Sequence, residues 1–357
     1  MALVFFLCYT GSMSLDNILR RIGVRKLKRF PFLMKFPFSK LTGYGRLSRA
    51  FYNGMKIVGG VPHIAPGHDF IPEHTEKELI DLNNNSDKNQ EIGMVIDYAS
   101  EVSLLSNKYR ISYSMYETTD IPEKWKEHVA KADEIFVPST FCADIFSKYN
   151  DNIKVVHPGI YDNIFKPLKN RKENDVFGVG ISGVMSERKG IDVLIRAFQL
   201  AFENKKDVRL VVKSRDTRWM PRIVDEKIIY KDEDWDDERL AFFYGSMDLM
   251  VYPARGEGIG LCQLEAASCG TPVLTTKWSG CTDYIDEKNV FGIDITGLVT
   301  VKSGSMMGEN TQWAEPSLSD LIDKLQHFYY NRKRIKFDNS YWAMESAAKR
   351  LIGALNI

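Results

Sequence analysis

The sequence predicts an α/β protein built from two units of similar size that face one another across a cleft. The chain has 357 residues, which is too long for one compact core. From residue 30 onward, short apolar runs alternate with helical patterns, as they do in open parallel sheets. A charged stretch, residues 166–175, interrupts this alternation, and we expect it to link the two units.

The first unit is expected to hold four strands and three helices. Its aromatic-rich first strand leads into a glycine turn at 42–45 that precedes the first helix. Pro122 suits the first turn of the second helix, and Ser139 suits the cap of the third. Thr75–Glu91 has little to bury, so we expect a surface loop. The four strands and the first helix are expected at Lys28–Phe38, Ile92–Ala99, Arg110–Tyr116, Ile135–Val137 and Arg46–Met55.

The second unit repeats this alternation after the linker. One of its helices places Ile191, Leu194 and Phe198 on a single face that suits a core. The chain ends in another amphipathic helix. The expected strands are Val176–Ser182, Val208–Val212 and Leu249–Pro253, and the expected helices are Gly190–Phe202, Glu238–Met247 and Asn339–Ile357.

Composition restricts the classes of protein that fit. The five cysteines lack zinc-ligand spacing, so a disulfide framework and a zinc module are not expected, and a reducing, intracellular setting is favoured. No apolar run approaches the roughly 18 residues that a membrane span needs. Ala2–Tyr9 is too short and lacks the basic flank of a signal peptide. We therefore expect a cytoplasmic protein.

The segment 253–272, PARGEGIGLCQLEAASCGTP, predicts a glycine loop followed by a helix. Gly258 and Gly260 allow the backbone to approach a ligand closely. Free N–H groups and the helix dipole at the start of the helix favour an anion such as a diphosphate. Glu257 and Glu265 lie on either side of this turn. Carboxylates and phosphates are both negatively charged, so we expect these carboxylates to accept hydrogen bonds from donors in another part of the ligand. Sugar hydroxyls are such donors, so the segment predicts a sugar diphosphate site.

This segment resembles the E-x7-E signature of the retaining glycosyltransferases of family 4, with Ile259 and Ser268 as departures. The stretches 42–46 (TGYGR), 116–118 (YET) and 188–190 (RKG) are similar to other motifs of that family. The resemblance implies a GT-B fold, in which two Rossmann-like domains face one another and the C-terminal one holds most of the nucleotide-sugar. The implied parts are a basic extension (1–28), an N-terminal acceptor domain (29–168), a C-terminal donor domain (176–335) and a last helix (338–357) that packs on the N-terminal domain.

The resemblance also implies roles for individual residues. Glu257 would contact the donor hexose, Glu265 the ribose, and Lys189 would neutralise the diphosphate. A fixed cation suits that position because the leaving nucleotide gains negative charge in the transition state. The expected catalytic residues are Glu257, Lys189 and Glu117, and the expected donor-binding residues are Gly43, Gly45, Lys213, Gly258, Ile259, Gly260, Leu261 and Glu265.

Two departures from the family pattern concern these roles. The usual arginine five residues before the lysine is Val184 here, and either Lys213 or Arg188 could replace it. The family's histidine after the fourth strand is absent, and Glu117 stands there instead. It would hydrogen-bond the donor sugar or orient the acceptor. His157 is expected to be structural.

Two charged segments have simpler explanations than metal or nucleic-acid binding. Asp232, Asp234 and Asp236 precede a helix, where acidic residues suit the N-terminus, so we expect no essential metal and no cofactor. Residues 1–50 carry ten Lys or Arg and one acid, whereas the whole chain has a net charge of +1. A basic amphipathic helix there would suit the inner face of an anionic membrane, and nucleic acid is not an expected partner. Its cations are Arg20, Arg21, Arg25, Lys26, Lys28 and Arg29.

Together these features favour a retaining, metal-independent glycosyltransferase. It would move a hexose from a nucleoside-diphosphate sugar to a hydroxyl of a glycan, a lipid-linked or a protein acceptor. One alternative is a nucleotide-sugar epimerase of the same fold, which would convert the donor without an acceptor. Another is a degenerate transferase that acts as a binding protein, which would bind no nucleotide-sugar.

Overall fold

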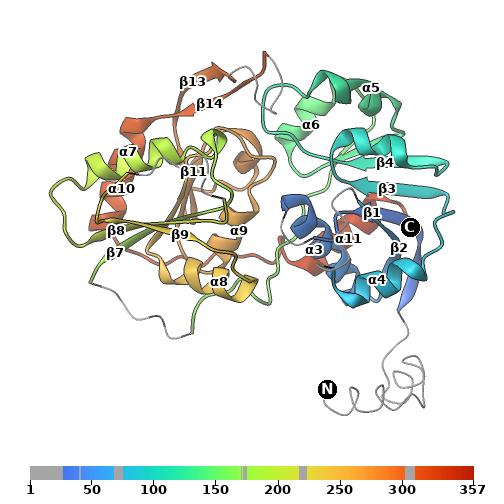
Figure 1. Cartoon of the computed structure of the whole chain (residues 1–357), viewed down its shortest axis with the longest axis horizontal. Helices are drawn as coiled ribbons and strands as arrows, with labels where there is room; N and C mark the ends of the chain where they lie inside the picture. Colours follow the sequence, from blue (N-terminus) through green and yellow to red (C-terminus); the bar gives the residue numbers. More distant parts are fainter. Residues whose placement is uncertain are drawn as a thin grey trace, which may run out of the picture.

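The computed structural model describes residues 27–39, 42–67, 75–169, 171, 175–216, 223–301 and 310–357. The chain forms two α/β units that lie side by side, with the N-terminal unit on the right of Figure 1 and the C-terminal unit on the left. Each unit is built on a six-stranded sheet in which the neighbouring strands run parallel. The predicted fold class of two α/β units is therefore confirmed.

The N-terminal sheet has the strand order β2-β1-β3-β4-β5-β6. Its central strands are buried on both faces, as parallel sheets covered by helices require. Ser139 caps α6, as predicted, since its Oγ accepts a hydrogen bond from the backbone N–H of Cys142. The elements are β1 (Lys28–Phe36), α3 (Gly43–Ile57), β2 (Gly60–Pro66), α4 (Lys77–Asn84), β3 (Ile92–Ile96), β4 (Tyr109–Tyr113), α5 (Glu123–Lys131), β5 (Glu134–Val137), α6 (Thr140–Phe146) and β6 (Ile153–Val155).

The C-terminal sheet has the order β12-β11-β10-β7-β8-β9, and a separate hairpin, β13–β14, reaches towards the other unit (Figure 1). In that hairpin the backbone of Gln312 exchanges two hydrogen bonds with Thr119. The elements are β7 (Phe177–Ser182), α7 (Ile191–Ala201), β8 (Val208–Ser214), β9 (Ile228–Asp232), α8 (Asp237–Ser246), β10 (Leu249–Tyr252), α9 (Leu261–Ser268), β11 (Val273–Thr276), β12 (Val290–Ile293), β13 (Ile295–Thr300), β14 (Gln312–Pro316) and α10 (Leu318–Tyr330).

The last helix, α11 (Met344–Ala354), returns to the N-terminal unit and packs against α3. Ala347, Ala348 and Leu351 are fully buried in the core of that unit. The two helices approach so closely that a Cβ atom at Gly54 would lie 2.0 Å from the carbonyl oxygen of Met344. The predicted return of the C-terminal helix is therefore present.

Several elements differ from the sequence-based expectations. Thr75–Glu91 is not only a loop, because it contains α4, whose one buried side chain is Leu79. Strand β2 contains Pro62 and Pro66 and was not expected. It lies at the edge of the sheet, where a residue without an N–H group is tolerated. The second unit also contains strands β9, β11 and β12, the β13–β14 hairpin and helix α10, none of which was expected.

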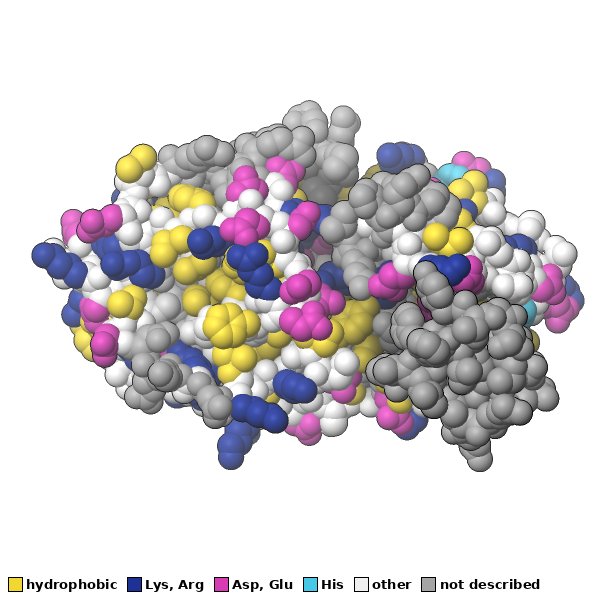
Figure 2. Space-filling model, turned by 60° about the horizontal axis from the view of Figure 1, so that its bottom comes forward, with side chains coloured by type: hydrophobic (Ala, Val, Ile, Leu, Met, Phe, Trp, Pro, Cys, Tyr) yellow, Lys and Arg dark blue, Asp and Glu magenta, His cyan; other side chains and the backbone are white. Residues whose placement is uncertain are grey.

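The predicted membrane-binding segment lies mostly outside the described residues. Arg20, Arg21, Arg25 and Lys26 are among the residues not described, so their role stays a prediction. Lys28 and Arg29 belong to β1 and not to a basic helix, because this end of the strand pairs with β2. On the face in Figure 2, cationic and anionic side chains are intermixed over the C-terminal unit. None of the described helices combines the length and the apolar character of a membrane span.

Candidate active site

The predicted glycine loop joins β10 to α9 at the junction of the two units. Gly260 has a φ of +82°, a left-handed conformation that favours glycine, and it caps α9. At Gly256 an added Cβ would lie 1.9 Å from the carbonyl oxygen of Glu117, and at Gly258 it would lie 2.7 Å from the sulfur of Met115. Both neighbours belong to the N-terminal unit. The glycines of this loop therefore allow the N-terminal unit to pack closely against it, and the loop from Gly256 to Gly260 is buried.

Glu257 lies in this loop and pairs with two cations. The Nζ of Lys189 donates to its Oε1 at 2.6 Å, and Arg188 donates to its Oε2 at 3.2 Å. Both cations sit in a tight turn after β7 that ends at Gly190, whose φ of +66° is again left-handed. Burial raises the pKa of Glu257, but Lys189 and Arg188 outweigh it and hold the pKa below its ordinary value. Glu257 is therefore ionised although only 6% of it is exposed.

Glu117 reaches the same place from the N-terminal unit, in the segment that follows β4. Its Oε1 lies 3.6 Å from the guanidinium of Arg188, so Arg188 lies between Glu117 and Glu257. Burial raises the pKa of Glu117, and the attraction of Arg188 only partly offsets this. The structure thus brings together the three expected catalytic residues, Glu257, Lys189 and Glu117.

Glu265 lies on α9 with 2% of its surface exposed. Its Oε1 accepts from Arg46 at 2.6 Å, and its Oε2 accepts from the hydroxyl of Tyr244 at 3.3 Å. Arg46 also bonds Asp237 at 2.6 Å. Burial raises the pKa of Glu265, and Arg46 opposes that shift without cancelling it. Sequence reasoning gave Arg46 no role, although it directly follows the glycine turn quoted for the family resemblance.

The predicted N-terminal glycines lie in the first turn of α3. Thr42 caps this helix, since its Oγ1 accepts from the N–H of Gly45 at 3.0 Å. A Cβ at Gly45 would lie 1.8 Å from the carbonyl oxygen of Ser39, so Gly45 has a packing reason to be glycine. Gly43 has no atom within 4 Å of an added Cβ. Of the two, only Gly43 leaves open space beside the chain.

Lys213, at the carboxyl end of β8, is buried with 8% exposed. Its ammonium lies 5.6 Å from the centre of the Trp235 ring, and within the described ranges no carboxylate forms an ion pair with it. Burial lowers its pKa, although Asp234 and the Cys262 thiol on α9 act in the opposite direction. Lys213 is therefore a buried cation near the start of α9. Val184, at the position of the missing arginine, is 41% exposed.

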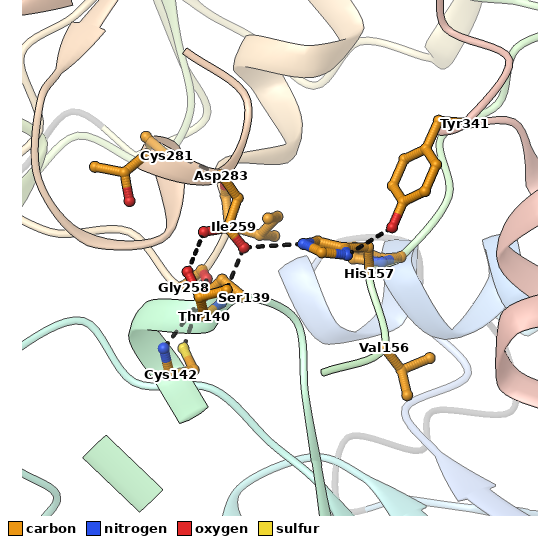
Figure 3. Close-up of polar contacts among 12 residues, drawn as sticks. Ser139, Thr140, Cys142, Val156, His157, Gly258, Ile259, Cys281, Asp283 and Tyr341 are labelled. Atoms are coloured by element: carbon orange, nitrogen blue, oxygen red, sulfur yellow. Dashed lines mark hydrogen bonds and ion pairs between the residues drawn. The ribbon is translucent and has the colours of Figure 1, made fainter. Parts of the chain in front are cut away.

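A second contact between the units adjoins the glycine loop (Figure 3). Ser139 donates to the carbonyl oxygen of Gly258 at 2.7 Å. Asp283 of the C-terminal unit accepts from the backbone N–H of Thr140 at 2.9 Å and also pairs with the Nε2 of His157 at 2.9 Å. Tyr341 contacts the other ring nitrogen of His157. His157 thus links the units, in keeping with a structural role.

Of the three acidic residues Asp232, Asp234 and Asp236, Asp236 has the expected capping role, whereas Asp232 is the last residue of β9. Asp236 accepts from the backbone N–H of Arg239 at 2.8 Å and so caps the helix. Asp237 pairs with Arg46, as described above. In the part of the chain that the structure describes, no group of three or more His, Cys, Asp or Glu side chains is arranged to hold a metal ion.

Part of the chain is similar in sequence to known glycosyltransferases. Residues 177–306 match the family model described as Glycosyl transferases group 1. A D-inositol 3-phosphate glycosyltransferase of Arthrobacter sp. (strain FB24) is 29% identical over 163 residues, which are 40% of this chain and 39% of that protein. Its counterpart from Paenarthrobacter aurescens (strain TC1) is 27% identical over 214 residues, which are 55% of this chain and 48% of that protein. The chain thus matches less than half the length of each of these curated relatives.

Solved structures resemble the chain over nearly its whole length. A sucrose-phosphate synthase from Thermosynechococcus elongatus superposes with a TM-score of 0.60 at 13% identity, covering 92% of this chain and 94% of the other. A glycosyltransferase from Rickettsia africae ESF-5 gives 0.60 at 14% identity, covering 93% and 94%. At sequence identities this low, the superpositions establish only that the fold is shared. The C-terminal unit therefore resembles the group 1 glycosyltransferases over the matched residues 177–306, and the chain has the GT-B fold.

Proposed function

We propose that this protein is a retaining glycosyltransferase that moves a hexose from a nucleoside-diphosphate sugar to a hydroxyl group of a glycan, a lipid-linked or a protein acceptor. The family and the fold support a nucleotide-sugar donor. One observation carries the assignment to this site: Lys189 holds the buried Glu257 ionised beside Glu117 of the facing unit.

In this proposal the donor diphosphate lies at the start of α9. The free N–H groups of that helix and the buried cation Lys213 favour an anion there, and the Lys189 ammonium is within reach of the same loop. Lys213 takes the place of the cation missing at Val184. Because Lys213 has no carboxylate partner within the described ranges, an incoming phosphate would compensate its buried charge.

The two acidic residues of the signature would then hold the sugars. An ionised carboxylate only accepts hydrogen bonds, so Glu257 and Glu265 suit hydroxyl groups of the hexose and the ribose. Glu117 faces Glu257 across Arg188 and is proposed to hydrogen-bond the donor hexose or to orient the acceptor hydroxyl.

In the proposed reaction the bond between the anomeric carbon and the phosphate oxygen breaks, and a bond to the acceptor oxygen forms on the same face of the sugar. The acceptor proton passes to the leaving phosphate, so no side-chain base is required. Lys189 stabilises the negative charge that develops on that phosphate. The chain needs no metal ion or other cofactor in this scheme.

The proposal is tested first with thermal-shift measurements against UDP-, GDP- and ADP-sugars, because a ligand that binds the folded state raises its melting temperature. The sugar nucleotide that binds is then incubated with candidate acceptors, and the product is analysed by NMR. We expect a glycoside with the anomeric configuration of the donor. An inverted product would contradict the retaining mechanism, conversion of the donor without an acceptor would indicate an epimerase, and the absence of any shift would contradict a donor site.

A further inference from the structure

Arg46 joins the two units at the carboxylate that the proposed function gives to the ribose. The guanidinium of Arg46, in the first turn of α3, donates to Glu265 on α9 and to Asp237 on α8, both at 2.6 Å. One side chain of the N-terminal unit thus bonds two helices of the C-terminal unit. A planar guanidinium with several fixed donors suits such a double contact better than a lysine ammonium does.

We propose that Arg46 is a positioning residue for donor binding, which orients the Glu265 carboxylate so that both of its oxygens accept hydrogen bonds from the ribose hydroxyl groups. This inference deepens the proposed function and rests on it, since that function places the ribose at Glu265.

The surroundings of Glu265 explain why it needs this partner. Only 2% of Glu265 is exposed, and burial raises its pKa. Within the described ranges, Arg46 is the one cation that forms an ion pair with Glu265. Without Arg46, the carboxyl group would bind a proton at a higher pH than it does in the wild-type protein. The titratable and charged groups that face Glu265 are Arg46 on α3, Asp237 and Tyr244 on α8, Tyr252 on β10, and Cys262 and Cys269 at the two ends of α9.

Arg46 and a ribose can use Glu265 at the same time. Each carboxylate oxygen has two lone pairs. Arg46 occupies one on Oε1, and the Tyr244 hydroxyl occupies one on Oε2. One lone pair therefore stays on each oxygen, which matches the two neighbouring hydroxyl groups of a ribose. A protonated carboxyl group would use one oxygen as a donor, and this match would be lost.

Arg49 provides a matched control on the same helix. It is buried, with 5% exposed, and pairs with Glu76 and with the carbonyl oxygen of Phe38. These partners lie in the N-terminal unit. Arg49→Gln therefore removes a buried cation of α3 and leaves the pair between Arg46 and Glu265 in place.

The experiment measures the binding of UDP, GDP and ADP by calorimetry between pH 5.5 and pH 8.5, in the wild-type protein and in Arg46→Gln. As the pH is lowered, we expect the nucleotide affinity of Arg46→Gln to start falling at a higher pH than the nucleotide affinity of the wild-type protein does. Below that pH the affinity should weaken by up to about tenfold per pH unit, as binding to an ionised carboxylate requires. The terminal phosphate of the nucleotide also titrates in this range, so the affinity of each variant is compared with the affinity of the wild-type protein at the same pH.

Three further variants separate positioning from a structural role. Arg46→Lys keeps a cation, so the pH at the midpoint of its affinity loss should lie closer to the wild-type value than that of Arg46→Gln does. The double variant Arg46→Gln/Glu265→Gln should lose the added pH dependence, because glutamine does not titrate. Arg49→Gln should keep the wild-type pH profile. Melting temperatures of all variants verify that they are folded.

Each outcome has a definite meaning. If the wild-type protein binds none of the three nucleotides, the proposed function fails. If it binds one and Arg46→Gln shows the wild-type pH profile, the proposed function survives and the positioning role of Arg46 is wrong. If Arg49→Gln shifts the profile as much as Arg46→Gln, the effect comes from the packing of α3, and this inference is overturned.

Discussion

Glu257 and Glu265 stand eight residues apart at two ends of one segment, but their charges are compensated in different ways. Glu257 pairs with Lys189 and Arg188, which belong to its own unit. Glu265 pairs with Arg46, which belongs to the other unit. The pKa of Glu257 lies below its ordinary value, whereas the pKa of Glu265 lies above it.

The two carboxylates are almost equally buried, with 6% and 2% exposed, so burial does not explain the difference. The neighbouring charges explain it, because Glu257 lies beside two cations, whereas Glu265 lies beside one cation and the Asp237 carboxylate, which raises its pKa. Glu257 keeps both of its cations whenever the C-terminal unit is folded. Glu265 keeps its cation only while the two units are in contact. The cations that pair with Glu257 therefore come from one unit, whereas the cation that pairs with Glu265 comes from the other unit.

The largest expected effect comes from Lys189→Ala at the hexose end. The variant loses the cation opposite the leaving diphosphate and leaves Glu257 with Arg188 alone. We expect the turnover of the sugar nucleotide to fall by about 10²- to 10³-fold. Steady-state kinetics measure this, with the exposed Lys131→Ala as the control. A turnover within threefold of the wild type would contradict the role of Lys189.

Gly256→Ala tests the contact between the units. Its Cβ would lie 1.9 Å from the carbonyl oxygen of Glu117, so the two units must move apart or the loop must shift. A displacement of about 1 Å at a reacting centre can cost about 10²-fold in rate, and we expect a loss of that order in kcat/KM. Gly353→Ala on α11 is the control, because it meets no atom within 4 Å. Equal activities for the two variants would exclude a tight contact at Gly256.

Asp283→Asn tests the second contact between the units, at Thr140 and His157. Burial would raise the pKa of Asp283, but His157 and Thr140 hold it below its ordinary value. The ionised Asp283 therefore stabilises the fold fully above the pKa that this residue has in the unfolded chain. This stabilisation is lost as the pH falls through the lower pKa that Asp283 has in the folded protein.

We expect Asp283→Asn to melt about 5 °C below the wild type at pH 7, since a charged hydrogen bond contributes about 2 kcal/mol. This difference should narrow below about pH 4. Melting curves from pH 7 to pH 3 measure it, with the exposed Asp151→Asn as the control. A difference that persists unchanged at pH 3 would show that the ionised carboxylate is not its cause.

The smallest expected effect is that of a chelator. Cations of the chain neutralise the diphosphate in our scheme, so turnover in EDTA should equal turnover without it. A loss of activity that Mg²⁺ or Mn²⁺ restores would contradict a metal-independent mechanism.

The difference between the two ends of the site also decides what the sequence could predict. The loop from Glu257 to Leu261 and the turn at Lys189 depend on local patterns of glycine, charge and helix starts, and these are visible in the chain. The bond between Arg46 and Glu265 joins residues 219 positions apart, so it depends on how the two units pack. No pattern in the chain indicates this bond, apart from the arginine that follows the glycine turn.

The same reasoning applies to the fold. The strands with continuous apolar runs, such as β3 and β10, were predicted close to their observed bounds. Strand β2 was missed because Pro62 and Pro66 interrupt its pattern, and only an edge position accommodates them. Helix α4 was missed because it buries only Leu79, which is too little for a recognisable stripe.

The most direct test of the account is the affinity of the double variant Lys189→Ala/Lys213→Ala for the nucleoside diphosphate that the wild-type protein binds. Lys189, in the turn after β7, and Lys213, on β8, both lie near the start of α9, and we propose that both contact the diphosphate. Calorimetry should show an affinity at least about 10²-fold weaker than that of the wild type. An unchanged affinity would contradict a diphosphate site at this place.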